Sequence, residues 1–218
     1  MHVVIAGGHG KIALILERLL SQRGDSVAGF IRNPDQIADI EAAGAVALVV
    51  DLEKASVDEV AAHLHGADAV VFAAGAGPGS GAARKETVDR DAAILLADGA
   101  EAAGVRRYVM ISAMGADPQA TADDEVFQAY LRAKGVADET IRSRTALDST
   151  IVRPGALTND PGTGRVTIAE STGRGSIPRE DVAAVLVAVL DEPRTAGRTF
   201  EVITGDTPIA EAVAALAR

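Results

Sequence analysis

The sequence predicts an α/β fold in which helices cover both faces of a doubly wound parallel sheet. Short segments rich in Val and Ile alternate with longer amphipathic segments rich in Ala and Leu. The short segments are apolar at successive positions, as expected of strands that are buried on both faces of a parallel sheet. The chain has 218 residues, which suits one α/β domain and leaves little sequence for a second core.

The first two thirds of the chain alternate regularly between expected strands and expected helices. The strands are expected at residues 3–6, 26–31, 46–50, 69–74, 107–111 and 149–153. The helices are expected at residues 11–23, 34–43, 57–64, 84–103 and 125–144. Gly24 and Gly44 follow the first two helices, at positions where a left-handed residue commonly ends a helix. A Gly-rich loop at residues 75–81 separates the fourth strand from the long fourth helix.

Beyond Pro154 the alternation is less regular. The elements expected there are a helix at residues 176–190, a strand at residues 199–203 and a last helix at residues 208–216. Pro178 would then lie in the first turn of its helix, where proline is well tolerated. No linker-like stretch or internal repeat divides the sequence. We therefore expect residues 1–218 to form a single domain, in which residues from about 154 to 218 make a small cap on the substrate side.

The composition excludes several classes of function. Asp and Glu total 31 and Lys and Arg total 21, so the formal net charge is −10, which disfavours binding to nucleic acid or to anionic membranes. The absence of Cys excludes disulfides, thiolate catalysis and Cys-based metal sites, and no metal site of another kind is expected. The apolar start of the chain reaches Gly7 after a few residues, which is too short for a signal peptide or a membrane span. We expect a cytoplasmic protein, monomeric or homodimeric, that acts on a small molecule.

The strongest motif lies between the first expected strand and the first expected helix. The spacing Gly-x-x-Gly-x-x-Ala, from Gly7 to Ala13, provides a tight turn, a close approach of backbone to a diphosphate, and a small residue for packing helix against strand. The helix start adds unpaired N–H groups and partial positive charge. The motif predicts a Rossmann-type sheet that binds a dinucleotide, whereas the alternative is a Gly-rich turn without a ligand. The diphosphate site is expected to comprise Gly7, Gly8, His9, Gly10, Lys11 and Ile12.

Arg32 indicates which dinucleotide is bound. An NAD-selective site usually has a carboxylate about 20 residues past the glycines, where it holds the ribose 2′-OH. This chain has Arg32 there, and a guanidinium can pair with a 2′-phosphate and stack on adenine. Lys11 offers a second positive charge. The sequence therefore favours NADP(H) over NAD(H), with a solvated arginine in a strand-end turn as the alternative.

The ends of the third and fourth strands add further candidate cofactor contacts. Asp51 and Leu52 end the third strand, where a carboxylate can accept a hydrogen bond from the adenine amino group. Ala73, Ala74 and Gly75 end the fourth, and their small side chains allow the cofactor backbone to lie close. Both groups are equally compatible with ordinary turns.

With these strand ends in order, the chain resembles the short-chain dehydrogenase/reductase superfamily, and within it the atypical branch described as NAD(P)-binding, NmrA-like or sugar-epimerase-like. The segments that carry the resemblance are residues 7–10, 32–34, 51–52, 73–75, 107–116 and 150–158. The resemblance spans nearly the whole chain, and it implies that Asn33, Ile111, Pro154 and Ala156 also lie at the cofactor. It does not identify the reaction, because relatives include flavin or quinone reductases, epimerase-like proteins and redox-sensing regulators.

Tyr130 and Lys134 match the YxxxK motif of that superfamily. Positions i and i+4 share one helix face, so the ammonium can lower the pKa of the phenol and bind the nicotinamide ribose. Such a tyrosine can exchange a proton while hydride moves to or from the cofactor. The alternative is an exposed pair on the helix surface, with Lys134 touching ribose only. In typical members the catalytic hydroxyl is the second residue of a Ser-Ser or Ser-Thr pair, whereas here Ser112 matches the first member and Ala113 the second.

Three functions are compatible with these features. The first is an NADP(H)-dependent oxidoreductase that acts on a small carbonyl, quinone or flavin-like acceptor. The second is a non-catalytic NADP(H)-binding redox sensor, which Ala113 favours. The third, a nucleotide-sugar epimerase or dehydratase, is disfavoured because the chain after Pro154 leaves little room for a second nucleotide pocket. We expect the first.

Overall fold

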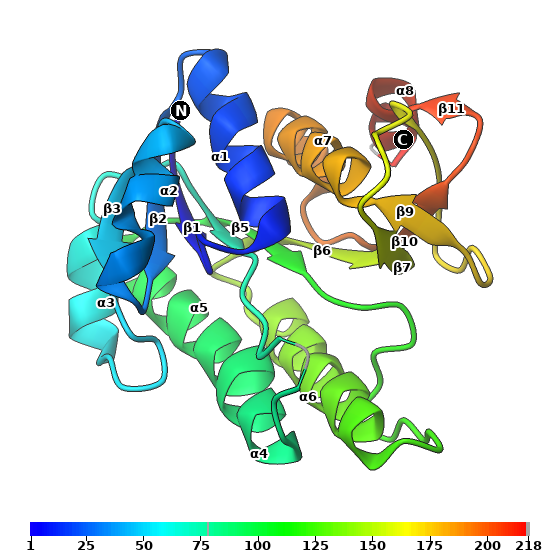
Figure 1. Cartoon of the computed structure of the whole chain (residues 1–218), viewed down its shortest axis with the longest axis horizontal. Helices are drawn as coiled ribbons and strands as arrows, with labels where there is room; N and C mark the ends of the chain where they lie inside the picture. The colour runs from blue at the N-terminus through cyan, green and yellow to red at the C-terminus, as the bar shows by residue number, and fades with distance from the viewer. Residues whose placement is uncertain (78, 217–218) are drawn as a thin grey trace.

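The computed structural model describes residues 1–77 and 79–216. Within these residues, nine strands form one mostly parallel sheet in the order β11-β8-β10-β6-β5-β4-β1-β2-β3. The predicted α/β fold with a Rossmann-type parallel sheet is therefore confirmed (Figure 1). The parallel strands are β1 (His2–Ala6), β2 (Ser26–Ile31), β3 (Val46–Val49), β4 (Ala69–Phe72), β5 (Arg107–Ile111), β6 (Asp148–Pro154) and β10 (Thr199–Thr204).

The helices lie on both faces of this sheet (Figure 1). One face is covered by α1 (Lys11–Gln22), α2 (Ile37–Ala42), α7 (Arg179–Asp191) and α8 (Ile209–Ala215). The other is covered by α3 (Val57–Leu64), α5 (Ala92–Ala103) and α6 (Glu125–Arg142). Alternate residues of β1 enter the two apolar layers, Val3 on the first side and Val4 on the second. This two-sided burial is why the strands are apolar throughout. None of the described helices is long and apolar enough to cross a membrane.

The helix expected at residues 84–103 has an irregular beginning. A short turn, α4 (Ala82–Arg84), leads into a π-helical segment at Lys85–Asp91, and α5 continues from there. Single π-turns inside helices occur frequently at functional sites. Here the wider turn contains two buried charged side chains, Lys85 and Asp89.

The last third of the chain differs most from the prediction. The helix expected at residues 176–190 begins only at Arg179, because Pro178 has an extended conformation and closes β9 (Ser176–Pro178), which pairs with β7 (Ala156–Thr158). The antiparallel strands β8 (Arg165–Ala169) and β11 (Thr207–Pro208) were also not expected. They lie at the sheet edge, where half-exposed residues give no continuous apolar signal. Part of the predicted cap thus extends the central sheet, since β10 pairs with β6.

Candidate functional site

A groove of about 220 Å³ lies where the carboxyl ends of β1, β2 and β4 meet the start of α1. In doubly wound sheets ligands bind at such a point, where neighbouring strands lead to opposite faces. The groove is lined by Gly7, His9, Gly10, Phe30, Ile31, Arg32, Gln36, Ala73, Ala74 and Gly75. Seven of these were expected at the cofactor. Phe30, Ile31 and Gln36 were not, although the first two end β2 directly before Arg32.

Gly7 allows the ends of β1 and β4 to approach closely. Its φ is +81°, and a Cβ there would lie 2.6 Å from Cα of Ala74. Its carbonyl accepts a hydrogen bond from the Gly10 N–H at 2.8 Å, which closes the turn. A side chain at residue 7 is therefore excluded by backbone conformation and by space.

The start of α1 has no side-chain cap. Its N-cap residue is Gly10, and its first turn has no acidic residue. The first N–H groups of the helix are therefore open to an anion, and the helix dipole places positive charge there. Lys11 is exposed beside this turn, whereas Ile12 is buried in the apolar core beneath it. The His9 ring lines the groove and is held by Asp39 of α2, with Nε2 2.7 Å from Oδ2.

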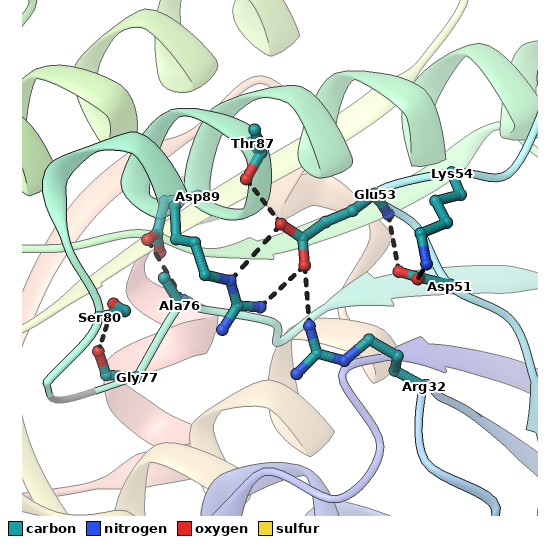
Figure 2. A network of polar contacts seen from close by, with 10 residues as sticks. Arg32, Asp51, Glu53, Lys54, Ala76, Gly77, Ser80, Thr87 and Asp89 are labelled. Atoms are coloured by element: carbon teal, nitrogen blue, oxygen red, sulfur yellow. Dashed lines mark hydrogen bonds and ion pairs between the residues drawn. The ribbon is translucent and has the colours of Figure 1, made fainter.

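At the outer end of the groove, Arg32 contacts a carboxylate that the sequence analysis had not identified. Nη1 of Arg32 donates to Oε2 of Glu53 at 2.9 Å, and Nη2 of Arg84 donates to the same oxygen at 2.8 Å (Figure 2). The Thr87 hydroxyl donates to the other oxygen at 2.7 Å. The hydrogen bond from Arg84 is the main reason why the pKa of Glu53 is lowered, with Thr87 and Arg32 adding to it. Glu53 directly follows the Asp51-Leu52 pair, which is the one sequence signal that could have indicated it.

The side chains next to this cluster serve local turns. Asp51 accepts from the Glu53 N–H at 3.1 Å and pairs with Lys54 at 3.3 Å (Figure 2). Asn33 accepts from the Asp35 N–H at 3.1 Å and caps the short turn Pro34–Gln36. Leu52 packs against the apolar layer below α3 and α5. The role of Asp51 at adenine stays a prediction.

Beside the residues that follow β4, Lys134 of α6 is almost completely buried. Its Nζ lies 3.4 Å from Oδ1 of Asp89, and it donates to the Ile111 carbonyl at 3.2 Å and the Ala74 carbonyl at 3.4 Å. Burial lowers the pKa of Lys134, while Asp89 and Asp138 oppose that effect. The alternative of an exposed surface pair is therefore wrong for Lys134. The side chain instead joins the ends of β4 and β5 to the π-helical segment.

Tyr130 lies one turn before Lys134, yet a different ammonium faces its ring. Nζ of Lys85 lies 5.5 Å from the ring centroid, and the same ammonium donates to the Gly77 carbonyl at 3.0 Å. The expectation that Lys134 lowers the pKa of this phenol is wrong. Burial raises the pKa of Tyr130, and Asp89 and Asp138 raise it further. The phenol is thus held in its protonated form.

Ser112 is buried at the end of β5 and faces Asp138 of α6, although the geometry falls short of a hydrogen bond. Oδ2 of Asp138 accepts from Nε of Arg153 at 2.8 Å. Burial raises the pKa of Asp138, while Ser112 and Arg153 oppose that shift. Beside this pair, the Pro154 carbonyl accepts from the Met114 N–H at 3.3 Å. Ala156 is exposed on β7.

Asp89 is the second residue that sequence reasoning missed. Its carboxylate is fully buried and accepts from the Ala76 N–H at 3.3 Å (Figure 2). It also lies beside Lys134. In the sequence it is one of several charged residues in an amphipathic segment, and only the π-helical turn shows that it points inward. Pro78 of the Gly-rich loop lies outside the described residues.

The comparison with protein families agrees with this geometry. A family model described as NAD(P)H-binding matches residues 7–193. The chain belongs to the NAD(P)H-binding family. The match starts at the first glycine of the turn before α1 and extends through α7. It therefore contains every residue that lines the groove.

Known proteins resemble this member of the NAD(P)H-binding family over almost its full length. The uncharacterized sugar epimerase YhfK of Bacillus subtilis (strain 168) is 40% identical over 214 residues, which is 98% of this chain and 99% of the relative. A Bacillus halodurans structure, assigned by name to the NAD-dependent epimerases/dehydratases, has a TM-score of 0.90 and 38% identity, and 99% of each chain is covered. The oxidoreductase ylbE from Lactococcus lactis has a TM-score of 0.86 and 27% identity, covering 99% of this chain and 96% of that chain. The resemblance to the atypical short-chain dehydrogenases/reductases is confirmed.

The residues around the groove fit the nicotinamide dinucleotide that the family binds. The close approach at Gly7 keeps the turn free of side chains, and the uncapped start of α1 offers N–H donors to a diphosphate. Arg32 lines the groove and adds positive charge, and the buried Lys134 donates to the carbonyl of Ala74, which is another lining residue. These features fit the diphosphate and adenosine parts of a dinucleotide.

Proposed function

We propose that the protein is an NADP(H)-dependent oxidoreductase that reduces a small carbonyl, quinone or flavin-like acceptor. The observation that carries the proposal is Arg32 at the end of β2, lining the groove next to the glycine turn. A carboxylate at this place would select the free 2′-OH of NAD(H), whereas a guanidinium offers paired donors to a 2′-phosphate. The side chain is 57% exposed and can reach a ligand in the groove.

In this proposal the groove and the YxxxK motif have separate roles. The glycine turn and the start of α1 bind the diphosphate, and Arg32 binds the 2′-phosphate. The nicotinamide of the bound coenzyme supplies the hydride to the acceptor. Tyr130 of the YxxxK motif donates the proton that the reduced acceptor needs. Lys134 is a positioning residue that fixes α6 against the ends of β4 and β5 through the Ala74 and Ile111 carbonyls.

The names of similar proteins support redox chemistry in general terms. The Lactococcus lactis relative is called an oxidoreductase, and the Bacillus halodurans relative is named for epimerase or dehydratase activity. Both reaction types use hydride transfer with a nicotinamide. The acceptor is not indicated by these names.

Ala113 and Ser112 favour a second candidate, a redox sensor without turnover. Ser112 faces Asp138, and residue 113 has no hydroxyl to polarise a carbonyl. A sensor must bind oxidised and reduced coenzyme with different affinity, because only differential binding can shift a conformational equilibrium.

One experiment separates the two candidates. NADPH oxidation is followed by absorbance with a quinone, free FMN and an aldehyde as acceptors, and the Kd values of NADPH and NADP⁺ are measured alongside. The oxidoreductase proposal predicts turnover with at least one acceptor class. Unequal affinities with no turnover of any acceptor would instead support the sensor.

A further inference from the structure

Three side chains from separate elements meet on the carboxylate of Glu53. Arg32 follows β2, Arg84 ends α4, and Thr87 belongs to the π-helical segment (Figure 2). Arg84 also approaches the other carboxylate oxygen through Nε, at 3.5 Å. Glu53 therefore ties the adenosine end of the groove to the segment that begins after the Gly-rich loop.

This cluster has more positive than negative charge, which favours the binding of an anion. Two guanidiniums share one carboxylate, so the group has a net positive charge. The side chains of Arg32 and Arg84 are 57% and 40% exposed, whereas that of Glu53 is 22% exposed. The positive groups thus face solvent, and the negative group lies behind them.

We propose that Arg84 is a second residue that recognises the 2′-phosphate of NADP(H), and that Glu53 is an internal substitute for that phosphate in the coenzyme-free protein. Glu53 holds Arg84 beside Arg32, so that the two guanidiniums are already together when the coenzyme arrives. The 2′-phosphate then takes over hydrogen bonds from both, and Glu53 competes with it. The inference rests on the proposed preference for NADP(H).

The chemistry of the two ribose substituents explains why this arrangement is selective. A phosphate monoester has close to two negative charges and three acceptor oxygens at neutral pH, so it can engage two guanidiniums at once. A hydroxyl is neutral and cannot displace a carboxylate from charge-assisted hydrogen bonds. A 2′-hydroxyl therefore leaves the cluster intact, whereas a 2′-phosphate can draw both guanidiniums away from Glu53.

The test uses adenosine 2′,5′-bisphosphate and 5′-AMP as probes, because they differ only in the 2′-phosphate. Titration calorimetry is performed on the wild-type chain, Arg32→Gln, Arg84→Gln and Glu53→Gln in the same low-salt buffer. Arg84→Gln is expected to weaken binding of the bisphosphate about tenfold, which corresponds to the loss of one charge-assisted hydrogen bond. The affinity for 5′-AMP should not change. Glu53→Gln is expected to tighten binding of the bisphosphate several-fold, because the competing charge is gone.

Arg90→Gln is the matched control. Arg90 lies in the same π-helical segment but pairs with Asp91 at 2.6 Å and contacts Glu86, away from the cluster. Its substitution should leave both affinities unchanged, and thermal melting of each variant reports on folding. Arg84→Lys keeps the charge and should recover part of the lost affinity.

The outcomes distinguish this inference from the proposed function. If Arg84→Gln binds the bisphosphate as tightly as the wild type, the role proposed for Arg84 is wrong. If Arg32→Gln still weakens that binding, the preference for NADP(H) nevertheless stands. If Glu53→Gln weakens binding of the bisphosphate, Glu53 does not compete with the 2′-phosphate. If the wild type binds 5′-AMP as tightly as the bisphosphate, the NADP(H) preference itself is contradicted.

Discussion

At the scale of single residues, Tyr130 is distinguished by a phenol whose pKa is raised by burial and by two nearby carboxylates. Its neutral form persists across the physiological pH range, and we propose it as the proton donor because it matches the tyrosine of the YxxxK motif. Tyr130→Phe should lower the rate of acceptor reduction by about a hundredfold or more. The KM for NADPH should not change, because Tyr130 does not line the adenosine groove.

Tyr108 provides the control for this substitution. Its hydroxyl is buried and donates to the Ala93 carbonyl at 2.9 Å. Tyr108→Phe should cost about 1 kcal/mol of stability in denaturant titrations and leave turnover unchanged. A Tyr130→Phe variant that turns over as fast as the wild type would remove the phenol from the mechanism.

A second residue, Glu17 of α1, is a buried carboxyl group beside the glycine turn, and its ionisation makes the stability of the fold depend on pH. It is fully buried, and within the described residues neither carboxylate oxygen has a hydrogen-bond partner. It packs where Gly8 and Gly29 approach each other, since a Cβ on Gly8 would lie 2.8 Å from Oε1. Burial raises the pKa of Glu17 from 4.5 to about 8.

The raised pKa predicts a specific dependence of stability on pH. Between pH 4.5 and about 8 the unfolded chain has lost a proton that the native state keeps, so the free energy of unfolding falls as pH rises through this range. Glu17→Gln has no proton to lose. Near pH 4.5, urea titrations should give similar free energies of unfolding for the wild type and Glu17→Gln. Near pH 8, the variant should be more stable, by the order of a few kcal/mol. Parallel pH profiles would show that Glu17 is ionised in the native protein.

At the scale of elements, Arg107 joins β5 to its neighbours. Nη1 donates to the Asp148 carbonyl and the Thr150 hydroxyl, and Nη2 to the Val189 carbonyl and the Thr195 hydroxyl, each at 2.8 Å. The guanidinium thus connects β5, β6, α7 and the turn that follows α7. Arg107→Met would leave these partly buried acceptors without donors and should destabilise the fold by about 2–4 kcal/mol.

The neighbouring Arg106 allows a direct comparison. It pairs with Asp148 at the surface, with Nη2 3.0 Å from Oδ1. Arg106→Met should leave the denaturation midpoint nearly unchanged, because exposed ion pairs contribute little. Equal effects of the two substitutions would contradict the structural role assigned to Arg107.

At the scale of the whole molecule, the local pattern predicted the strands that are continuous apolar runs, including the exposed edge strand β3. The strands from β1 to β6 and the glycine turn follow from continuous apolar runs and from the spacing Gly7-x-x-Gly10. Strand β8, which lies between β11 and β10, did not, because Arg165 and Thr167 interrupt its apolar residues. Pro178 was misassigned to a helix since its φ suits both a first helical turn and the extended conformation that it adopts.

The site residues at the ends of neighbouring strands could be predicted from the sequence. The site residues whose partners lie in distant segments of the chain could not. Arg32 was found from its spacing to the glycines. Glu53 and Asp89 were not, because the partners that give them a role lie 31 and 45 positions away, at Arg84 and Lys134. Such pairs are set by the tertiary fold and by the π-helical turn rather than by local sequence.

The most direct measurement of the central claim is calorimetric titration of the wild-type chain and Arg32→Gln with NADPH and with NADH. We predict that the wild type binds NADPH more tightly than NADH, and that Arg32→Gln weakens NADPH binding about tenfold or more while NADH binding is unchanged. Absence of binding heat with either coenzyme, or tighter binding of NADH by the wild type, would contradict it.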